Sequence, residues 1–141
     1  MRLLDAADRP SGPLRDRLID KGYDDETVAA VVDRLIEVGL VDDESYAQSA
    51  VRYCVGRLMG YRGAVMELAR KGVDRPLAER VCDEARMSGV FEDAAWELGR
   101  RSAAKTQGMD PKVRKRRFWS SGGRKGHDAE TLRAVAHELF D

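Results

Sequence analysis

The sequence predicts an all-α fold built from tandem copies of one three-helix unit, and three observations support this prediction. Charged residues make up 35% of the 141 residues and aromatic residues 6%, and no strand-length run alternates β-branched with polar residues. Apolar side chains instead recur at the spacing of an amphipathic helix. A short signature of the form Lys-Gly-x-Asp also occurs three times, which indicates a repeat protein.

The signature sets the period of the repeat. It begins at Lys21, returns 50 residues later at Lys71, and returns again at Lys125. The third signature follows the second by 54 residues, so four residues have been inserted, and residues 120–123 (Ser-Ser-Gly-Gly) are the expected insertion. Further markers keep the 50-residue offset: Gly39 with Gly89, Tyr46 with Trp96, Leu18 with Leu68, and Leu68 with Phe118.

Each signature is expected to end one helix and begin the next. The glycine can adopt the left-handed conformation that closes a helix, and the aspartate two residues later can accept the first free amide protons of the next helix. Pro76 falls in the first turn of the second copy, where its missing amide proton costs little. Apolar side chains then follow at helical spacing: Val28, Val31, Val32, Leu35 and Ile36; Ala78, Val81, Cys82 and Ala85; and Leu132, Val135, Ala136, Leu139 and Phe140.

A second glycine closes the first two of these helices, and a longer helix is expected to follow each of the two. Gly39 and Gly89 are these glycines, and the acidic residues at 42–44 and 92–93 come where the longer helices would begin. Three helices per unit are therefore expected. The longer helices carry Tyr46, Ala50, Tyr53 and Cys54 in one copy and Trp96, Ala103 and Ala104 in the next.

The 50-residue offset also places the start of the sequence within the repeat. Leu3 and Leu4 align with Tyr53 and Cys54, which puts Met1 in the middle of a first helix. The first unit would then lack roughly three turns of that helix, either naturally or through trimming. The expected units are residues 1–41, 42–90 and 91–141.

No set of residues indicates an enzyme, and we expect no catalytic residue, metal or cofactor. His127 and His137 lie ten residues apart and are expected to be structural or surface residues. Cys54 and Cys82 fall at apolar positions of helical patterns, so we expect small buried side chains with free thiols. Three acidic pairs could hold Mg²⁺ in principle, but two of them sit at expected helix N-termini, where the helix dipole accounts for them: Asp24-Asp25, Asp42-Asp43 and Asp83-Glu84.

The sequence contains no pattern that indicates a membrane protein. No stretch approaches the roughly 20 apolar residues of a membrane span, and the N-terminus lacks the residue order of a signal peptide. We therefore expect a soluble, cytoplasmic monomer without a membrane partner.

The net charge of zero hides a gradient along the chain. Residues 1–48 hold six basic and twelve acidic side chains, residues 49–99 hold eight of each, and residues 100–141 hold eleven basic and five acidic side chains. Such asymmetry bears on the choice of partner more than the total charge does. The third segment contains a basic run, residues 112–117 (Lys-Val-Arg-Lys-Arg-Arg). A helix that carries this run would contact phosphates without sequence preference and with strong salt dependence.

The basic run can be oriented on its helix. If Phe118 faces the core, the 100° step per residue points Lys112 and Arg116 directly outward and Lys115 and Arg117 to the flanks. The pattern thus predicts a basic face directed away from the core.

Arg114 does not fit this face, because its counterparts in the other units are Leu14 and Ala64. Either its side chain extends past the core or the third unit is more loosely packed. Phe118-Trp119 could stack on bases, although Phe118 fits the core better. The candidate binding residues are Arg52, Arg57, Arg62, Arg70, Lys71, Arg100, Arg101, Lys105, Lys112, Lys115, Arg116, Arg117, Arg124 and Lys125.

Three stretches of the sequence resemble the RecX family of regulators of the recombinase RecA. They are residues 39–47 (Gly-Leu-Val-Asp-Asp-Glu-Ser-Tyr-Ala), Val51-Arg52, and residues 67–73 (Glu-Leu-Ala-Arg-Lys-Gly-Val). The resemblance covers nearly the whole chain and is strongest in the middle repeat. It departs from the family at Gly63 and Ala64, where the family often has basic and branched apolar residues, and the glycine offers no basic contact at position 63.

The resemblance implies both a shape and a function. It implies three tandem three-helix repeats in an elongated, curved molecule, without a catalytic residue. It also implies binding to the RecA filament on single-stranded DNA, in the groove of the filament, and inhibition of ATP hydrolysis, strand exchange and co-protease activity. Such a protein would act in DNA repair, recombination and the SOS response.

Two other functions stay open on the residues alone. The chain could bind single- or double-stranded DNA directly, with consecutive short helices acting as helix-turn-helix units and the basic run contacting phosphates. It could also be a scaffold for some other protein. DNA binding without RecA would favour the first of these alternatives.

Overall fold

The computed structural model describes residues 12–13, 16–17, 21–22, 24–37 and 42–141, and every regular element in this part of the chain is a helix. The all-α prediction is confirmed for these residues. The predictions made at Met1, Leu3, Leu4, Leu14, Leu18 and Gly39 lie outside them. The helices are α2 (Asp25–Glu37), α3 (Asp43–Gly56), α4 (Tyr61–Arg70), α5 (Arg75–Met87), α6 (Val90–Lys105), α7 (Pro111–Arg124) and α8 (Ala129–Phe140).

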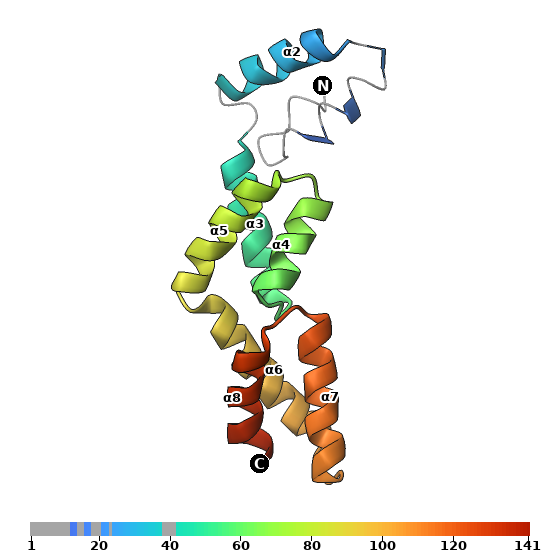
Figure 1. Cartoon of the computed structure of the whole chain (residues 1–141), viewed down its shortest axis with the longest axis vertical. Coiled ribbons are helices and arrows are strands. Elements are labelled where there is room, and N and C mark those ends of the chain that lie inside the picture. Colours follow the sequence, from blue (N-terminus) through green and yellow to red (C-terminus); the bar gives the residue numbers. More distant parts are fainter. Residues whose placement is uncertain (1–11, 14–15, 18–20, 23, 38–41) are drawn as a thin grey trace.

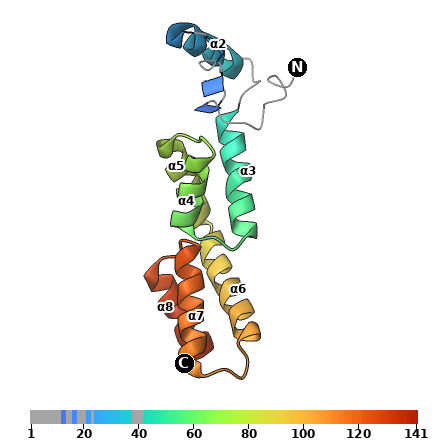
Figure 2. The same cartoon turned by 90° about the vertical axis from the view of Figure 1, so that its right-hand side faces the viewer.

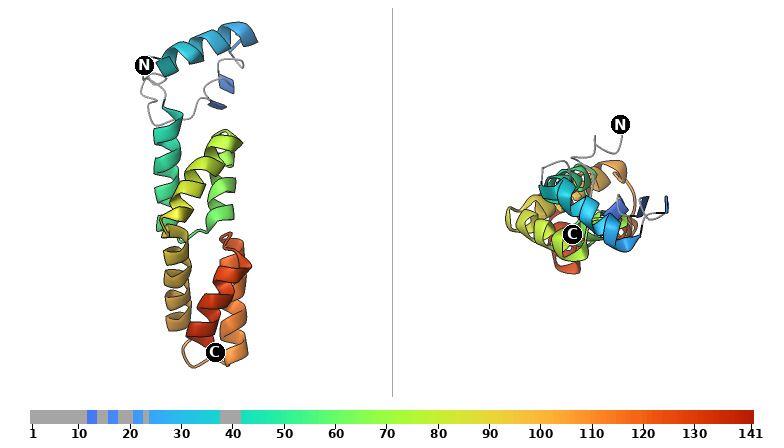
Figure 3. Two further views of the ribbon diagram at one scale, coloured as in Figure 1. Left: turned by 60° about the vertical axis from the view of Figure 1, so that its left-hand side comes forward. Right: turned by 90° about the horizontal axis from the view of Figure 1, so that it is seen from above.

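Helices α3, α4 and α5 pack against one another as one three-helix unit, and α6, α7 and α8 pack as another. The two units are stacked along the long axis of the molecule, with α2 at the end away from α8 (Figure 1). Helices α3 and α6 run along the same side of the stack, as Figure 2 and the left view of Figure 3 show. The predicted tandem repeat of three-helix units is therefore confirmed, and the molecule is elongated.

The glycines and aspartates of the signature end and begin helices as predicted. Gly72 and Gly126 have φ angles of 94° and 83°, in the left-handed region that favours glycine. Asp128 accepts a hydrogen bond from the backbone N–H of Thr131 at 2.7 Å, and this bond lowers the pKa of its carboxyl group. Asp74 differs because its side chain makes no capping hydrogen bond, and Pro76 fixes the first turn of α5 instead.

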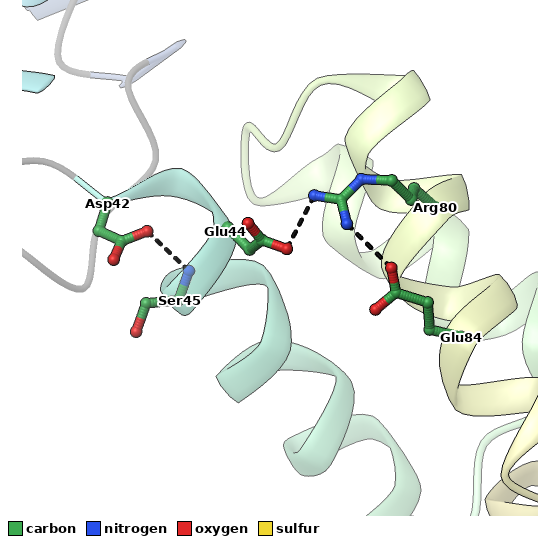
Figure 4. Close-up of polar contacts among 5 residues, drawn as sticks. All are labelled: Asp42, Glu44, Ser45, Arg80 and Glu84. Atoms are coloured by element: carbon green, nitrogen blue, oxygen red, sulfur yellow. Dashed lines mark hydrogen bonds and ion pairs between the residues drawn. The ribbon is translucent and has the colours of Figure 1, made fainter.

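Helix α3 begins at an aspartate and is tied to α5 by an arginine. Asp42 accepts a hydrogen bond from the backbone N–H of Ser45 at 2.9 Å. This agrees with the prediction that the longer helix begins at the acidic residues 42–44. Arg80 on α5 donates to Glu44 on α3 and to Glu84 on its own helix, both at 2.9 Å (Figure 4). These exposed ion pairs add little stability, but they define the face that α5 turns towards the start of α3.

Each of the two three-helix units has its own buried cluster. The predicted apolar positions of α5 and α8 are buried, except that Ala85 and Leu139 are half-buried. In α2, Val28 and Val32 are buried, but Val31 is 43% exposed, contrary to the prediction. The largest fully buried side chains include Phe118, Leu68, Leu132, Val135, Cys54 and Cys82.

Both cysteines are buried and free, as predicted. Burial raises the pKa of the Cys82 thiol to about 12 and also raises the pKa of Cys54. Because a thiolate is disfavoured at both positions, the two side chains act as small apolar groups.

The third unit carries its extra residues at the start of α7, so the prediction that residues 120–123 are the insertion is wrong. In the turn after α4 the N–H of Val73 donates to the carbonyl of Leu68, and in the turn after α7 the N–H of His127 donates to the carbonyl of Gly122. Gly122 is thus the counterpart of Leu68. Helix α7 has 14 residues where α4 has 10, and residues 120–123 are part of it.

Close helix packing explains the glycine at position 122. A Cβ atom there would lie 2.4 Å from Cδ2 of Leu132 on α8. In the other unit a leucine, Leu68, occupies the α4 position and Ala78 the corresponding position of α5. Large and small side chains have therefore exchanged places between the two units. Phe118 is fully buried, as predicted, but it is not the counterpart of Leu68.

Candidate functional site

Hydrogen bonds join the two three-helix units where the end of α3 meets the turn after α7. The N–H of Gly60 donates to the carbonyl of Lys125 at 2.8 Å, and the Lys125 ammonium donates to the carbonyl of Arg57 at 2.8 Å. The Nε2–H of His127 donates to the carbonyl of Leu58, also at 2.8 Å. Leu58 has a φ angle of 62°, a conformation that the surrounding contacts must hold in place. We call this region the unit junction.

Glycines allow the close approach of the backbones at the unit junction. A Cβ atom on Gly126 would lie 2.1 Å from the nitrogen of Gly63, and a Cβ atom on Gly63 would lie 2.3 Å from the carbonyl oxygen of Lys125. A Cβ atom on Gly60 would lie 2.6 Å from the backbone of His127. Position 63 therefore serves the packing of the two units in this chain.

A cleft of about 400 Å³ opens beside the unit junction, between the end of α3 and helices α6 and α7. Among the described residues that line it there is no carboxylate. A group of positive charges of this kind favours an anionic partner. We call this hollow the basic cleft. Five of the predicted binding residues line it: Arg57, Arg101, Lys105, Arg117 and Lys125.

A second hollow, of about 360 Å³, adjoins the basic cleft and shares Arg57 and Lys125 with it. Arg70 lines this hollow and pairs with Glu67, and its hydrogen bonds lower the pKa of the Glu67 carboxyl group. The described lining residues of the hollow therefore hold four cations and one carboxylate. We call it the Tyr53 pocket, after its aromatic residue, and its full lining is Tyr53, Arg57, Met59, Glu67, Arg70, Arg124 and Lys125.

The other predicted binding residues line neither hollow. Three of them have local partners, since Arg52 donates to Ser49, Arg100 pairs with Glu97, and Lys115 pairs with Asp141. Lys71 lies 5.4 Å from the centroid of the Tyr53 ring, at the edge of the Tyr53 pocket. The remaining three are exposed on α4 and α7: Arg62, Lys112 and Arg116.

Arg114 has a structural role, so its long side chain is not a sign of loose packing. Its guanidinium donates to the carbonyl of Ala103 at 3.0 Å and to the hydroxyl of Thr106 at 3.1 Å, at the end of α6. It also lies 5.4 Å from the centroid of the Phe140 ring. A cation at a helix C-terminus stabilises the unpaired carbonyl groups there.

Comparison with known proteins decides the family. The regulatory protein RecX of Thermobifida fusca (strain YX) is 37% identical over 143 residues, which cover 99% of this chain and 76% of the relative. The chain belongs to the RecX family. A second relative, the regulatory protein RecX of Chlorobium limicola, is 28% identical over 99% of this chain and 86% of its own length.

Two further matches cover part of the RecX sequence. The regulatory protein RecX of Mycobacterium sp. (strain JLS) is 48% identical over 77 residues, which are 52% of this chain and 41% of the relative. The family model described as the first three-helix domain of RecX matches residues 1–35.

A solved structure agrees with the RecX fold. The crystal structure of RecX from Lactobacillus salivarius superposes with a TM-score of 0.81 over 93% of this chain and 85% of the other. The two sequences are 20% identical, so this likeness concerns the fold alone.

Two residues near the candidate binding surface, Tyr53 and His127, were not among the predicted binding residues. Tyr53 is 53% exposed although it stands beside the buried Cys54, and a helical-wheel count from Ala50 and Cys54 could have found this. His127 is 3% exposed, and burial lowers the pKa of its imidazole. Of the two expected roles, structural or surface residue, the structure confirms the structural one for His127. Its hydrogen bond to Leu58 could not be predicted from the sequence.

The rest of the described part of this RecX chain offers less chemistry. The described residues hold no cluster of three or more His, Cys, Asp or Glu side chains with the geometry of a metal site. None of the described helices is long and apolar enough to cross a membrane. A largely apolar hollow of about 410 Å³ lies between α3 and α5, where Val51, Val55 and Val81 line it.

Proposed function

We propose that this chain binds the RecA filament on single-stranded DNA and inhibits its recombinase, ATPase and co-protease activities. Membership of the RecX family supports the class of function, a regulatory protein. The basic cleft at the unit junction is the candidate binding surface, and it is the observation on which the proposal depends. Five cations and no carboxylate are among its described lining residues. In this proposal no residue is catalytic and no cofactor is required.

The shape supports a filament as the partner. Stacked three-helix units present a long surface, and a filament offers the same site on successive subunits. Several weak contacts made at once give a high avidity without a strong contact at any one position. A monomer that lies along the groove therefore needs only modest complementarity in each unit.

The charge gradient supports an orientation in the groove. We take the repeats as residues 1–41, 42–90 and 91–141, of which the first is acidic and the third is basic. The basic end would face DNA phosphate or an acidic surface of the recombinase. Reversing the charges of Lys112 and Arg116, both exposed on α7, should weaken inhibition, and undiminished inhibition would contradict this orientation.

The test is the rate of DNA-dependent ATP hydrolysis by RecA, titrated with this protein at two salt concentrations. The expected result is a rate that falls with added protein, less steeply at the higher salt concentration. An unchanged rate at a large excess of the protein would contradict the proposal.

A second candidate is a protein that binds nucleic acid directly, and the charge of the basic cleft favours it. Such a protein would bind DNA in the absence of RecA, with an affinity that falls steeply with salt. It would slow ATP hydrolysis only by sequestering DNA, so an excess of single-stranded DNA would restore the rate. Inhibition that persists in excess DNA favours the filament as the partner.

A further inference from the structure

An exposed aromatic ring stands among the cations of the unit junction. Tyr53 lies on α3, where its neighbours Ala50, Val51 and Cys54 face the core, yet its own side chain is 53% exposed. The guanidinium of Arg57 lies 5.6 Å from the centroid of its ring and the ammonium of Lys71 lies 5.4 Å from it. A tyrosine this exposed is not explained by the packing of the core.

The surroundings of the ring combine apolar and cationic walls. Met59 lines the Tyr53 pocket beside the ring, and Arg57, Arg124 and Lys125 line it with positive charge. Glu67 is the acidic side chain of the pocket, and its charge is matched by Arg70. The volume of about 360 Å³ lies within the range of sites that hold one small organic group.

The pocket is continuous with a phosphate-compatible surface. Arg57 and Lys125 line both the Tyr53 pocket and the basic cleft, so a chain of anionic groups could pass from one hollow to the other across these two residues. Lys125 is held in place because its ammonium donates to the carbonyl of Arg57. An aromatic platform beside a cationic track is the arrangement that binds unpaired nucleic acid strands.

We propose that the Tyr53 pocket binds one unpaired nucleotide, with the base stacked on the Tyr53 ring and the flanking phosphates on Arg57, Arg124 and Lys125. The inference deepens the proposed function. It rests on that function in one respect, namely that the RecA filament supplies the single strand. Bases in a duplex are stacked inside it and cannot reach the ring, so the pocket distinguishes single strands from duplexes. An acidic peptide would use the cations but would gain nothing specific from the ring.

The experiment measures binding by fluorescence anisotropy with three labelled probes of equal length: an oligothymidylate, a strand of abasic sites with the same phosphates, and a duplex. The wild type is expected to bind the oligothymidylate more tightly than either of the other probes. Tyr53→Leu should weaken oligothymidylate binding about fivefold to hundredfold and leave binding of the abasic strand unchanged. Tyr53→Phe keeps the ring and should stay within about twofold of the wild type.

Two results would overturn the inference. In one, Tyr53→Leu leaves oligothymidylate binding unchanged. In the other, it weakens binding of the abasic strand by the same factor, so that the ring only arranges the neighbouring cations. Circular dichroism of each variant verifies folding, and Tyr53→Phe provides a conservative comparison if Tyr53→Leu unfolds. A wild type that inhibits RecA but binds the abasic and thymidylate strands equally contradicts this inference alone. Base-dependent binding without inhibition contradicts the proposed function alone.

Discussion

His127 donates its Nε2–H to the carbonyl oxygen of Leu58 at 2.8 Å and so links the turn after α7 to the end of α3. The bond is buried, since His127 is 3% exposed. Arg57, the residue before Leu58, and Lys125, two residues before His127, line both hollows. The geometry of the candidate binding surface therefore depends on the contact between the two units.

The same histidine makes stability depend on pH. Burial lowers the pKa of His127 below its ordinary value of 6.5, so in acid the unfolded chain takes up a proton that the folded chain does not. The stabilising contribution is complete above about pH 6.5 and is lost as the pH falls from there through the folded-state pKa. We predict that the free energy of unfolding, measured with urea, decreases between pH 7 and pH 5.

His127→Gln is the matched control, because its amide can donate to Leu58 but does not titrate. Its free energy of unfolding should change less over the same pH range. Asp128 has a lowered pKa, and it loses its contribution only as the pH falls below about 3.8, outside this range. Equal pH slopes for the wild type and His127→Gln would contradict the assignment.

Gly126 should be intolerant of any side chain. It combines a φ angle of 83° with a backbone approach that would place a Cβ atom 2.1 Å from the nitrogen of Gly63. Gly126→Ala is expected to lower the free energy of unfolding by about 2–4 kcal/mol, measured by urea denaturation. Gly123→Ala is the control, because a Cβ atom there meets nothing within 4 Å and the residue is helical. It should raise stability by about 0.5–1 kcal/mol, and a similar loss in both variants would refute the close approach.

The contact between α7 and α8 gives a test of the exchanged side-chain sizes. Gly122→Ala would place a Cβ atom 2.4 Å from Leu132 and should cost about 1–3 kcal/mol through overpacking. Leu132→Ala alone should also destabilise the protein, because the smaller side chain leaves a cavity. In the double variant the new methyl group occupies part of that cavity. The two losses are therefore expected to be less than additive in a double-mutant cycle, and strict additivity would count against the contact.

The helices and their caps could be predicted because they depend on local patterns. The left-handed glycines, the capping Asp42 and Asp128, and the buried positions of α5 and α8 follow from spacing and side-chain chemistry alone. The all-α repeat follows from the same patterns, and the family from the residues that carry the resemblance.

The errors arise where tertiary packing overrides local preference. Residues 120–123 have the composition of a loop, but they lie in helix α7, where the packing against Leu132 leaves no room for a side chain at Gly122. The side chain of Arg114 interacts with the end of α6, eleven residues away, and sequence spacing alone does not indicate this. The basic residues were selected by charge. Only the structure shows which of them line the two hollows, and that Lys115, Arg70 and Arg101 pair with nearby carboxylates.

The most direct measurement compares two charge-matched variants in the RecA ATPase titration. Arg101→Gln/Arg117→Gln removes two cations from the basic cleft, and Arg75→Gln/Arg133→Gln removes two exposed cations from α5 and α8. The account predicts that the half-inhibitory concentration rises about tenfold or more for the cleft variant and stays within about twofold for the other. Equal inhibition by both variants would contradict the assignment of the basic cleft as the binding surface.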